Sequence, residues 1–576
     1  MKIEIIDETT KRGAGGLDKN GIKLLRHYVA EASDHLYNDF LKREKPETIQ
    51  VFVNYLEEGV LGRYLSSKDN CIRIRIEKSI IHYTEDTQYC NPKRVIAHEL
   101  VHGVDVIQRW RDEYNAFRDC TKRYWYSLEG IMAKIDKWRS EGVARLGETL
   151  IYPELEKRYP RKEIVLDSFI HLLEELLAGR NVDQKIWYED ADIVLVEAMR
   201  GLGLITDEEA VCYCNNFYIY DDATKLLRDA LSMSLSQFIE GIFIACMGKS
   251  SLVEKLLSYC ASILNRKEKD KVTLFILLTE DRMLKVNDYN ETMEEIVGTI
   301  IPDEMLEQMV RDLRENDDNQ ANSNALRMIN PLYDFYLQYK EDNFYKEHAK
   351  AANWALNYYF KRIDLIHDDL VFWGHVDDMM LLKATQRMID REMGADLIYQ
   401  LNDAGDGLVV TGCRSTTCDI YIPAWLVFEG KRYPVLEVRL GDVGMHPSLY
   451  ISENVETINT DDLWGGLELL SIRVAERNLH YDSREGCNAI IETATNQLIV
   501  GCKATTIPFT VTSIGSGAFR HCLSWDYRCG GGMYKDLLIP DGVVEIAPDA
   551  FECFRGVIYF RDPSMIEPTG FDVKSI

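Results

Sequence analysis

Basic residues are scarce in this sequence. Lys and Arg number 67 against 94 Asp and Glu, which gives the 576-residue chain a formal net charge of −27. A charge of this sign repels a phosphate backbone, and no local cluster of basic residues offsets it. The balance therefore argues against nucleic acid and against anionic membrane surfaces as partners.

Long apolar runs are missing too. The first residues, MKIEIIDETTKRGAGG, contain no apolar stretch after a basic segment, and the apolar stretch at 238–247 is short and carries a Glu. We therefore expect neither a secretory signal nor a membrane-spanning helix.

Closely spaced cysteine pairs are almost absent. The 14 cysteines are scattered singly, and Cys212 and Cys214 lack the two-residue spacer of thiolate zinc sites and thioredoxin-like motifs. We expect buried free thiols and, with no export signal, a cytoplasmic protein.

The chain is too long for one ordinary core, and its sequence pattern changes twice. Segments 49–55 and 71–80 alternate apolar and polar residues, as strands do, after a helix expected at about 20–42. From about 115 to 395 apolar residues recur at helical spacing, and after about 400 short β-type runs, glycines and Ile-Pro pairs follow. These changes predict a multidomain α+β protein, with an α+β domain at 1–155, a large all-α middle at 156–398 and a β-rich domain at 400–576.

The strongest chemical motif is HELVH, in which His98 and His102 lie four residues apart on a helix that Asn91 caps and Pro92 begins. Both imidazoles project from the same helix face, so both can bind one metal ion. Glu99, beside the first ligand, can take a proton from an attacking water. The alternative is a chance pair of helix-surface histidines. The apolar neighbours of the motif and the two strands before it count against that alternative.

A catalytic zinc needs a third protein ligand and an open position. The motif, followed by Glu141, Gly142 and Ala144, resembles the gluzincin family of zinc metallopeptidases over roughly residues 45–155. In that family a Glu-Gly-x-Ala helix supplies the third ligand, and its small residues let it pack closely against the HExxH helix. The resemblance implies a zincin-like fold for 1–155 and one catalytic Zn²⁺ ion, bound by the two histidines and Glu141.

The sequence departs from the family in two ways. Glu141 comes 39 residues after His102, which is longer than in thermolysin-like enzymes, and Arg145 occupies the position where those carry a supporting Asp. Glu148, on the same helical face, stays open as an alternative third ligand, whereas Asp105 is nearer in sequence but badly placed to bind the same ion. A metzincin is excluded, because the motif lacks the following glycine and third histidine of that class.

The implied reaction is hydrolysis of a peptide bond. Zinc would polarise the carbonyl, and Glu99 would take the proton of the water and pass it to the leaving amine. An extended substrate would add to an edge strand through main-chain hydrogen bonds, for which 71–80 is the candidate. The residue that stabilises the oxyanion is left open among Tyr124, Tyr126, Arg145 and His171.

The C-terminal part contains an internal repeat in which Ile, Val and Ile recur at the same spacing. The three copies are Ile451, Val455, Ile458; Ile507, Val511, Ile514; and Ile539, Val543, Ile546, and the last two also share Ala518-Phe519 and Ala550-Phe551. Short units with regular apolar positions bury their faces against their neighbours, which predicts a leucine-rich-repeat-like solenoid. The alternative is a β-sandwich with chance similarity.

Two further segments of the chain resemble known families. Most of 403–560, and 480–519 in particular, is similar to BspA-type leucine-rich repeats, which implies a surface that recognises a protein partner. A segment at about 345–392 is similar to the small YkvA-like helical domain, whose Asp-rich pattern here comprises Asp364, Asp368, Gly374, Asp377 and Asp378. These aspartates either cap helices or hold a divalent cation, and capping is the commoner use.

The sequence therefore predicts a zinc metallopeptidase that cleaves peptide bonds in a specific protein substrate, with the repeats for recognition or regulation, as in a bacterial defence protein. One rival is a zincin-fold binding scaffold without activity that acts through its repeats, although the intact Glu99 speaks against it. A second rival keeps the zinc but hydrolyses other amide bonds, such as those of cell-wall peptides.

Overall fold

The fold is known from a computed structural model of the whole chain. It describes residues 1–9, 16–57, 60–68, 70–82, 91–104, 125–153, 162–178, 190–214, 223–246, 252–258, 275–276, 278–279, 284–315, 320–361, 365–366, 374–414, 419–439, 448–459, 469, 471–502, 504–520, 537–552, 554, 557–560 and 572–575.

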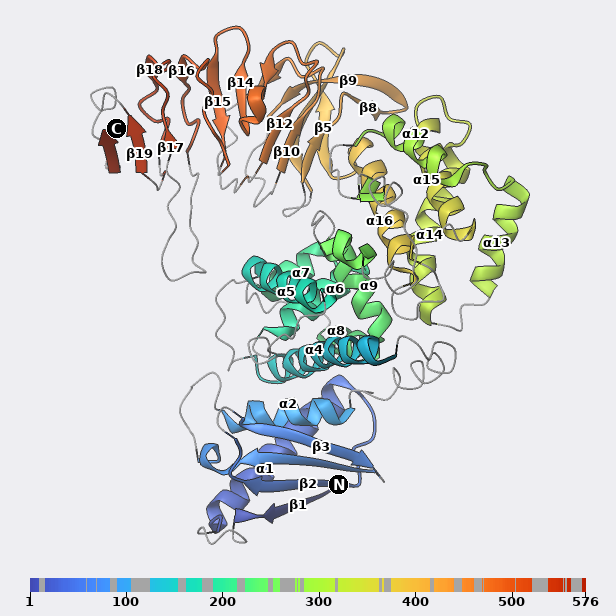
Figure 1. Cartoon of the computed structure of the whole chain (residues 1–576), viewed down its shortest axis with the longest axis vertical. Helices are drawn as coiled ribbons and strands as arrows, with labels where there is room; N and C mark the ends of the chain where they lie inside the picture. The colour runs from blue at the N-terminus through green and yellow to red at the C-terminus, as the bar shows by residue number, and fades with distance from the viewer. Residues whose placement is uncertain are drawn as a thin grey trace. The chain divides into compact units, whose positions relative to one another are not determined.

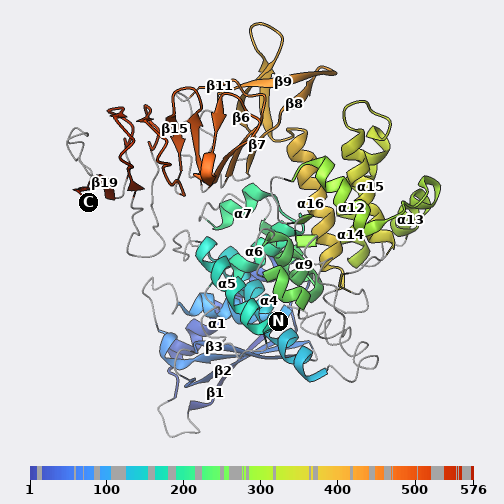
Figure 2. The ribbon, with the colours of Figure 1, turned by 45° about the horizontal axis from the view of Figure 1, so that its top comes forward.

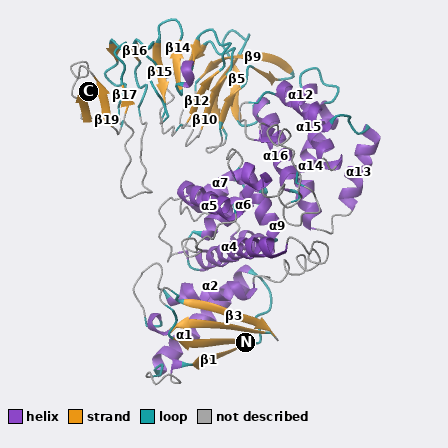
Figure 3. Ribbon diagram, viewed as in Figure 1, coloured by secondary structure: helices purple, strands orange, loops and turns teal. Residues whose placement is uncertain are grey.

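The protein is a mixed α/β chain in which about half of the described residues are helical and the C-terminal region is rich in strands (Figure 3). It divides into two compact units whose segments alternate along the chain. Unit 1 comprises Met1–Asp281, Thr292–Pro331 and Trp354–Lys383, and unit 2 comprises Arg282–Glu291, Leu332–Asn353 and Ala384–Ile576.

Unit 1 begins with a four-stranded sheet in the order β1-β2-β4-β3. Its strands are β1 (Lys2–Asp7), β2 (Thr48–Asn54), β3 (Gly62–Lys68) and β4 (Cys71–Glu77). β1, β2 and β4 are parallel, and β3 pairs antiparallel with β4 at the edge. The predicted strands at 49–55 and 71–80 are confirmed, but the second is not an edge strand, because β2 and β3 pair with its two sides. The two edge strands of this sheet are β1 and β3.

The inner face of this sheet is covered by helices α1 (Lys19–Asp34) and α2 (Pro92–Val104) (Figure 1). The alternating Ile and Val side chains of β2 and β4 are buried on this face, among them Val51 and Ile74, both fully buried. α2 also contacts α1 and α4 (Trp125–Ile151), so it lies between the sheet and the helical part of unit 1 (Figure 1). Figure 2 shows α4 above the strands β1, β2 and β3. The HELVH motif is therefore in the interior of the unit.

Further helices pack around α4. Helices α6 (Ala191–Gly201) and α9 (Leu235–Ala245) contact α4, and Gly201 and Gly241 let them approach each other closely. The remaining helices near them are α5 (Lys162–Leu177), α7 (Asp207–Cys214) and α8 (Ala223–Ser232).

Another group of helices in the described ranges comes directly before the C-terminal strands. They are α12 (Val286–Val297), α13 (Asp303–Glu315), α14 (Gln320–Tyr339), α15 (Lys346–Lys361) and α16 (Val376–Glu392). None of the helices within the described ranges combines the length and apolarity needed to cross a membrane.

The strand-rich part of unit 2 begins at residue 397. Its strands are β5 (Leu397–Leu401), β6 (Leu408–Cys413), β7 (Ile420–Ile422), β8 (Trp425–Phe428), β9 (Lys431–Val438), β10 (Ser448–Ile451), β11 (Thr457–Ile458), β12 (Ser471–Val474), β13 (Tyr481–Asp482), β14 (Ala489–Glu492), β15 (Gln497–Gly501), β16 (Ser513–Ile514), β17 (Leu537–Leu538), β18 (Glu545–Ile546), β19 (Val557–Phe560) and β20 (Asp572–Ser575).

The repeated sequence positions are equivalent in space. β16 and β18 are parallel, with Ile514 opposite Ile546, and the two repeat phenylalanines Phe519 and Phe551 stack with ring centroids 5.4 Å apart. The repeated Val455, Val511 and Val543 are all buried. The last two copies thus lie side by side and share one cluster of buried side chains, whereas Val455 of the first copy belongs to a separate cluster.

Candidate metal centre

The α2 helix starts where the sequence predicts. The Asn91 side-chain oxygen accepts a hydrogen bond from the Lys93 backbone N–H at 3.0 Å, and Pro92 begins the helix. Because the helix continues without interruption to Val104, His98 and His102 project from one face, one turn apart.

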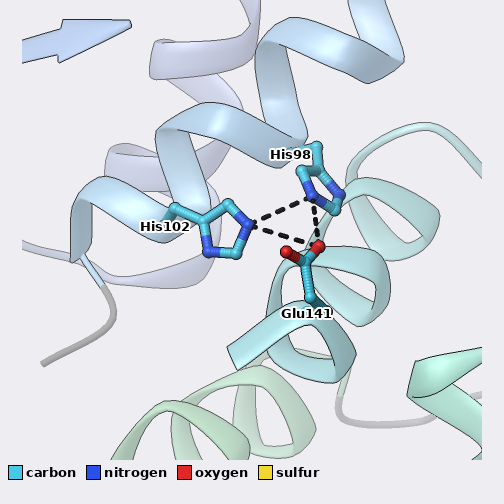
Figure 4. Close-up of side chains that lie close together, drawn as sticks. All are labelled: His98, His102 and Glu141. Atoms are coloured by element: carbon cyan, nitrogen blue, oxygen red, sulfur yellow. Dashed lines mark hydrogen bonds and ion pairs between the residues drawn. The ribbon is translucent and has the colours of Figure 1, made fainter. Parts of the chain in front are cut away.

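The structure brings His98, His102 and Glu141 together from two helices, α2 and α4 (Figure 4). The two Nε2 atoms lie 3.1 Å apart, and Glu141 Oε2 lies 3.2 Å from His98 Nε2 and 3.6 Å from His102 Nε2. In the part of the chain that the structure describes, this is the one group of three such side chains close enough to share a metal ion.

These separations fit a zinc ion. Zinc bonds of about 2.0–2.1 Å to nitrogen and oxygen at tetrahedral angles require donor atoms roughly 3.3 Å apart. The three observed distances of 3.1, 3.2 and 3.6 Å bracket that value. Two imidazoles and one carboxylate are also the protein donor set of a catalytic zinc, which leaves a fourth position open.

The outer nitrogens of both imidazoles have partners of their own. His98 Nδ1 lies 3.2 Å from Glu148 Oε2, and His102 Nδ1 lies 3.2 Å from Ser140 Oγ. Such bonds orient each ring so that its Nε2 faces the point where the three donor atoms converge. Glu148, the alternative ligand of the sequence, thus lies behind His98 instead of beside Glu141. Its carboxylate contacts the outer nitrogen of His98, whereas the sequence position of the supporting Asp in the resembled family is occupied by Arg145.

Glu148 is itself held by two buried arginines. Arg94 Nη2 donates to its Oε1 at 2.6 Å, and Arg145 donates to the same oxygen. Burial alone would raise the pKa of Glu148, but Arg145, His98 and Arg94 outweigh it and hold that pKa well below its ordinary value. The carboxylate is therefore ionised at neutral pH.

The charges of the three ligand residues depend on one another. Burial tends to raise the pKa of Glu141, but hydrogen bonds from His102 and His98 hold it well below its ordinary value. Burial by itself lowers the pKa of His98, but Glu141 and Glu148 outweigh burial and raise this pKa to about 10. Without a metal ion, the excess of carboxylates is thus balanced by a proton on His98, which an incoming cation would replace.

Glu99 lies against the edge strand β3. It is 6% exposed, burial raises its pKa, and it accepts a hydrogen bond from the Tyr64 backbone N–H. A Cβ atom at Gly62 would lie only 2.5 Å from Glu99 Oε1 and 2.6 Å from Val95 Cγ1. Glycine at 62 is therefore what lets the strand approach the carboxylate.

The small residues of α4 do not all serve the packing that the family resemblance implies. A Cβ at Gly147 would lie 2.6 Å from Val101 Cγ2 of α2, so this glycine permits the close approach of the two helices. Gly142 instead faces α6, where an added Cβ would lie 2.7 Å from the Ala191 carbonyl oxygen.

The open oxyanion candidates fare differently. Tyr124 and the Tyr126 side chain lie outside the described residues. So does Asp105, which the sequence analysis considered as a metal ligand. Arg145 is bound to Glu148 on the far side of His98, and His171 is exposed on α5. Tyr64, which the sequence did not single out, has its ring centroid 6.3 Å from that of His102. Only the contact between β3 and α2 reveals it.

The Asp-rich segment forms a separate buried arrangement. Asp377 Oδ2 accepts hydrogen bonds from the Leu365 and Ile366 backbone N–H groups and from the Tyr358 hydroxyl, at 2.9, 3.2 and 2.8 Å. Asp364 and Asp368 lie outside the described residues. The described contacts of Asp377 are those of a side chain that caps backbone groups.

Comparison with known proteins adds little. No family model matches the sequence, and no curated protein matches it. Among solved structures the chain is similar to a leucine-rich repeat protein from Eubacterium ventriosum, with 14% identity, 32% of this chain and 67% of that chain covered, and a TM-score of 0.18. This likeness supports no conclusion about activity.

Proposed function

We propose that the protein is a zinc-dependent metallopeptidase of the gluzincin type, with His98, His102 and Glu141 as the zinc ligands and Glu99 as the general base. One observation carries the proposal. Three donor atoms from α2 and α4 converge at 3.1 to 3.6 Å, the spacing of ligands around one zinc ion, with the Glu99 carboxylate on the same helix as two of them.

When bound, zinc supplies a Lewis acid that polarises the scissile carbonyl and makes water acidic. Glu99 takes the proton of the attacking water and later delivers it to the amine that leaves as the C–N bond breaks. Its raised pKa favours the first of these transfers, because a carboxylate of higher pKa is the stronger base. Glu148 and Ser140 orient the two imidazoles.

The substrate would bind along β3. This edge strand lies against α2, and an extended peptide can pair with main-chain groups along its outer side in the manner of an added strand. Such pairing recognises the backbone, so selection of one protein substrate needs a second surface. We assign that role to the leucine-rich-repeat-like part of unit 2, whose partner would be a protein, as in a bacterial defence system that must restrain its peptidase.

Metal content and cleavage test the proposal together. Elemental analysis is made of wild type, Glu99→Gln and Glu141→Ala, and each is assayed on a peptide library. We expect about one zinc per chain in wild type and Glu99→Gln, loss of zinc in Glu141→Ala, and cleavage by wild type alone.

Other results would point elsewhere. Wild-type protein that holds no zinc and cannot be loaded with it would leave a binding scaffold as the better account. Zinc with cleavage of cell-wall peptides, but of no protein, would support the rival amide hydrolase.

A further inference from the structure

Tyr64 joins the edge strand to two residues of the proposed site. Its backbone N–H donates to Glu99, and its ring lies beside the imidazole of His102, at 36° and 6.3 Å between centroids. One residue of β3 thus contacts the proposed base and approaches a proposed zinc ligand.

The register of the sheet accounts for this position. Tyr64 is opposite Ile74 of β4, and directly opposed residues point to the same face of a sheet. Ile74 is fully buried on the face that α2 covers, whereas the neighbouring Arg63 is exposed. The phenol therefore extends toward α2 and the metal position.

The Tyr64 hydroxyl is available to a ligand. The side chain is partly buried, and within the described residues no group hydrogen-bonds its hydroxyl. Buried tyrosines usually find a partner for this group, so a partly buried phenol beside a polar cluster, with no partner among the described residues, is suited to one from the substrate.

Peptide hydrolysis creates the demand for such a donor. As the water oxygen bonds to the carbonyl carbon, negative charge moves to the carbonyl oxygen, and a fixed donor lowers the energy of that state. Arg145 cannot serve, because its guanidinium is engaged by Glu148 behind His98.

We propose that the Tyr64 hydroxyl donates a hydrogen bond to the scissile carbonyl oxygen as it becomes an oxyanion, and keeps its own proton throughout. This inference rests on the proposed peptidase function. It assigns the oxyanion donor to the same strand that binds the substrate backbone, so binding of the peptide and stabilisation of the developing charge are linked.

The test compares Tyr64→Phe with wild type and with Tyr55→Phe. Tyr55, just after β2, is 46% exposed and serves as the matched control. The readouts are zinc content, thermal midpoint, kcat and KM on a peptide cleaved by wild type, and the affinity for a phosphinic analogue of that peptide. Phosphinate is tetrahedral and anionic, like the hydrated carbonyl.

We expect Tyr64→Phe to keep its zinc and its KM, to lose roughly 10²-fold in kcat, and to bind the phosphinic peptide more weakly by a similar factor. Tyr55→Phe should match wild type. A Tyr64→Phe enzyme with wild-type kcat and inhibitor affinity would overturn the assignment, and so would loss of zinc or a change in KM alone.

The two proposals fail in distinguishable ways. If wild type cleaves peptides and Glu99→Gln does not, an unaffected Tyr64→Phe removes only the role of Tyr64. If wild type cleaves no peptide and binds no phosphinic analogue, the peptidase function fails, and the role of Tyr64 fails with it.

Discussion

At the scale of single residues, the site depends on side chains that support the ligands. Ser140 and Glu148 each hold the outer nitrogen of an imidazole, and neither belongs to the HELVH motif. Their effect is on metal affinity and on the stability of the buried charges, because neither points at the metal position. Two substitutions separate these effects.

Ser140→Ala removes the hydroxyl that holds His102 Nδ1. We expect roughly 10-fold weaker zinc binding, at the low end for partners of metal ligands, with the fold unchanged. Competition with a chelator of known affinity measures it. Ser232→Ala, which removes an exposed hydroxyl at the last residue of α8, should leave the affinity unchanged. Equal affinities for the two variants would deny Ser140 any part in the site.

Glu148→Gln leaves Arg94 and Arg145 without the charge they share. Removing one partner of a buried ion pair destabilises by about 3–5 kcal/mol, so we expect a clear fall in the midpoint of denaturant unfolding. The comparison is Glu307→Gln, whose pair with Arg311 on α13 has side chains 57% and 54% exposed. An exposed pair contributes at most about 1 kcal/mol. Similar losses for both variants would contradict this account.

At the scale of elements, helices and strands approach the site closely where glycine permits it. β3 reaches Glu99 at Gly62, and α2 and α4 approach each other at Gly147. Elsewhere in unit 1, helix α9 carries Glu240 in its buried face, 8% exposed. The contact at Gly62 bears on the proposed activity, and the buried Glu240 bears on stability.

Gly62→Ala introduces a methyl group within 2.6 Å of both Glu99 and Val95. We expect zinc to be retained, because the three ligands are untouched, and cleavage to fall strongly, because Glu99 or the strand must move. Gly412→Ala is the control, since an added Cβ there meets nothing closer than 3.6 Å. Wild-type cleavage by Gly62→Ala would show that the close approach of β3 to Glu99 has no functional role.

Glu240 makes unit 1 sensitive to pH. Burial raises its pKa from 4.5 to about 7, and the nearby His375 offsets this only in part. Because the folded-state pKa is the higher one, its contribution is fully present below about pH 4.5 and is lost as pH rises through about 7. The loss is about 3 kcal/mol.

Unfolding of wild type and Glu240→Gln at pH 5 and pH 8 measures this contribution. We expect wild type to lose more stability between these pH values than the variant does, while Glu254→Gln, at an exposed position, behaves as wild type. The idea is wrong if wild type and Glu240→Gln respond to pH in parallel.

At the scale of the whole molecule, the two compact units are built from alternating segments of one chain. Within unit 2, the C-terminal half of α16 contacts the strand-rich part, since the Arg391 guanidinium lies 4.7 Å from the Tyr421 ring centroid and Tyr421 stacks on Tyr450. The proposed metal centre lies wholly in unit 1 and the repeats wholly in unit 2. The proposed catalysis and the proposed recognition are therefore assigned to different units.

A chain that ends after Gly394 tests the proposed restraint. We expect it to keep its zinc, to cleave short peptides faster than the full chain, and to lose selection of a protein substrate. Zinc analysis and peptide assays on both chains measure this, with Glu99→Gln in each as the blank. Equal rates on short peptides would mean that the repeats do not restrain the site.

The sequence by itself determined what depends on local spacing. The strands near 49–55 and 71–80, the start of α2 at Asn91 and Pro92, and the common face of His98 and His102 follow from periods of two and 3.6 residues, so a single segment suffices to read them. The repeat likewise appeared as a recurring pattern.

Only the tertiary structure decided which separate elements meet. It brought Glu141 to the two imidazoles, turned Glu148 to the outer side of His98, directed Gly142 toward α6, and made β3 the edge strand beside Glu99. No local pattern encodes these relations, because each depends on how two segments distant in the sequence pack against each other, and several residues of α4 have the right chemistry for the same place.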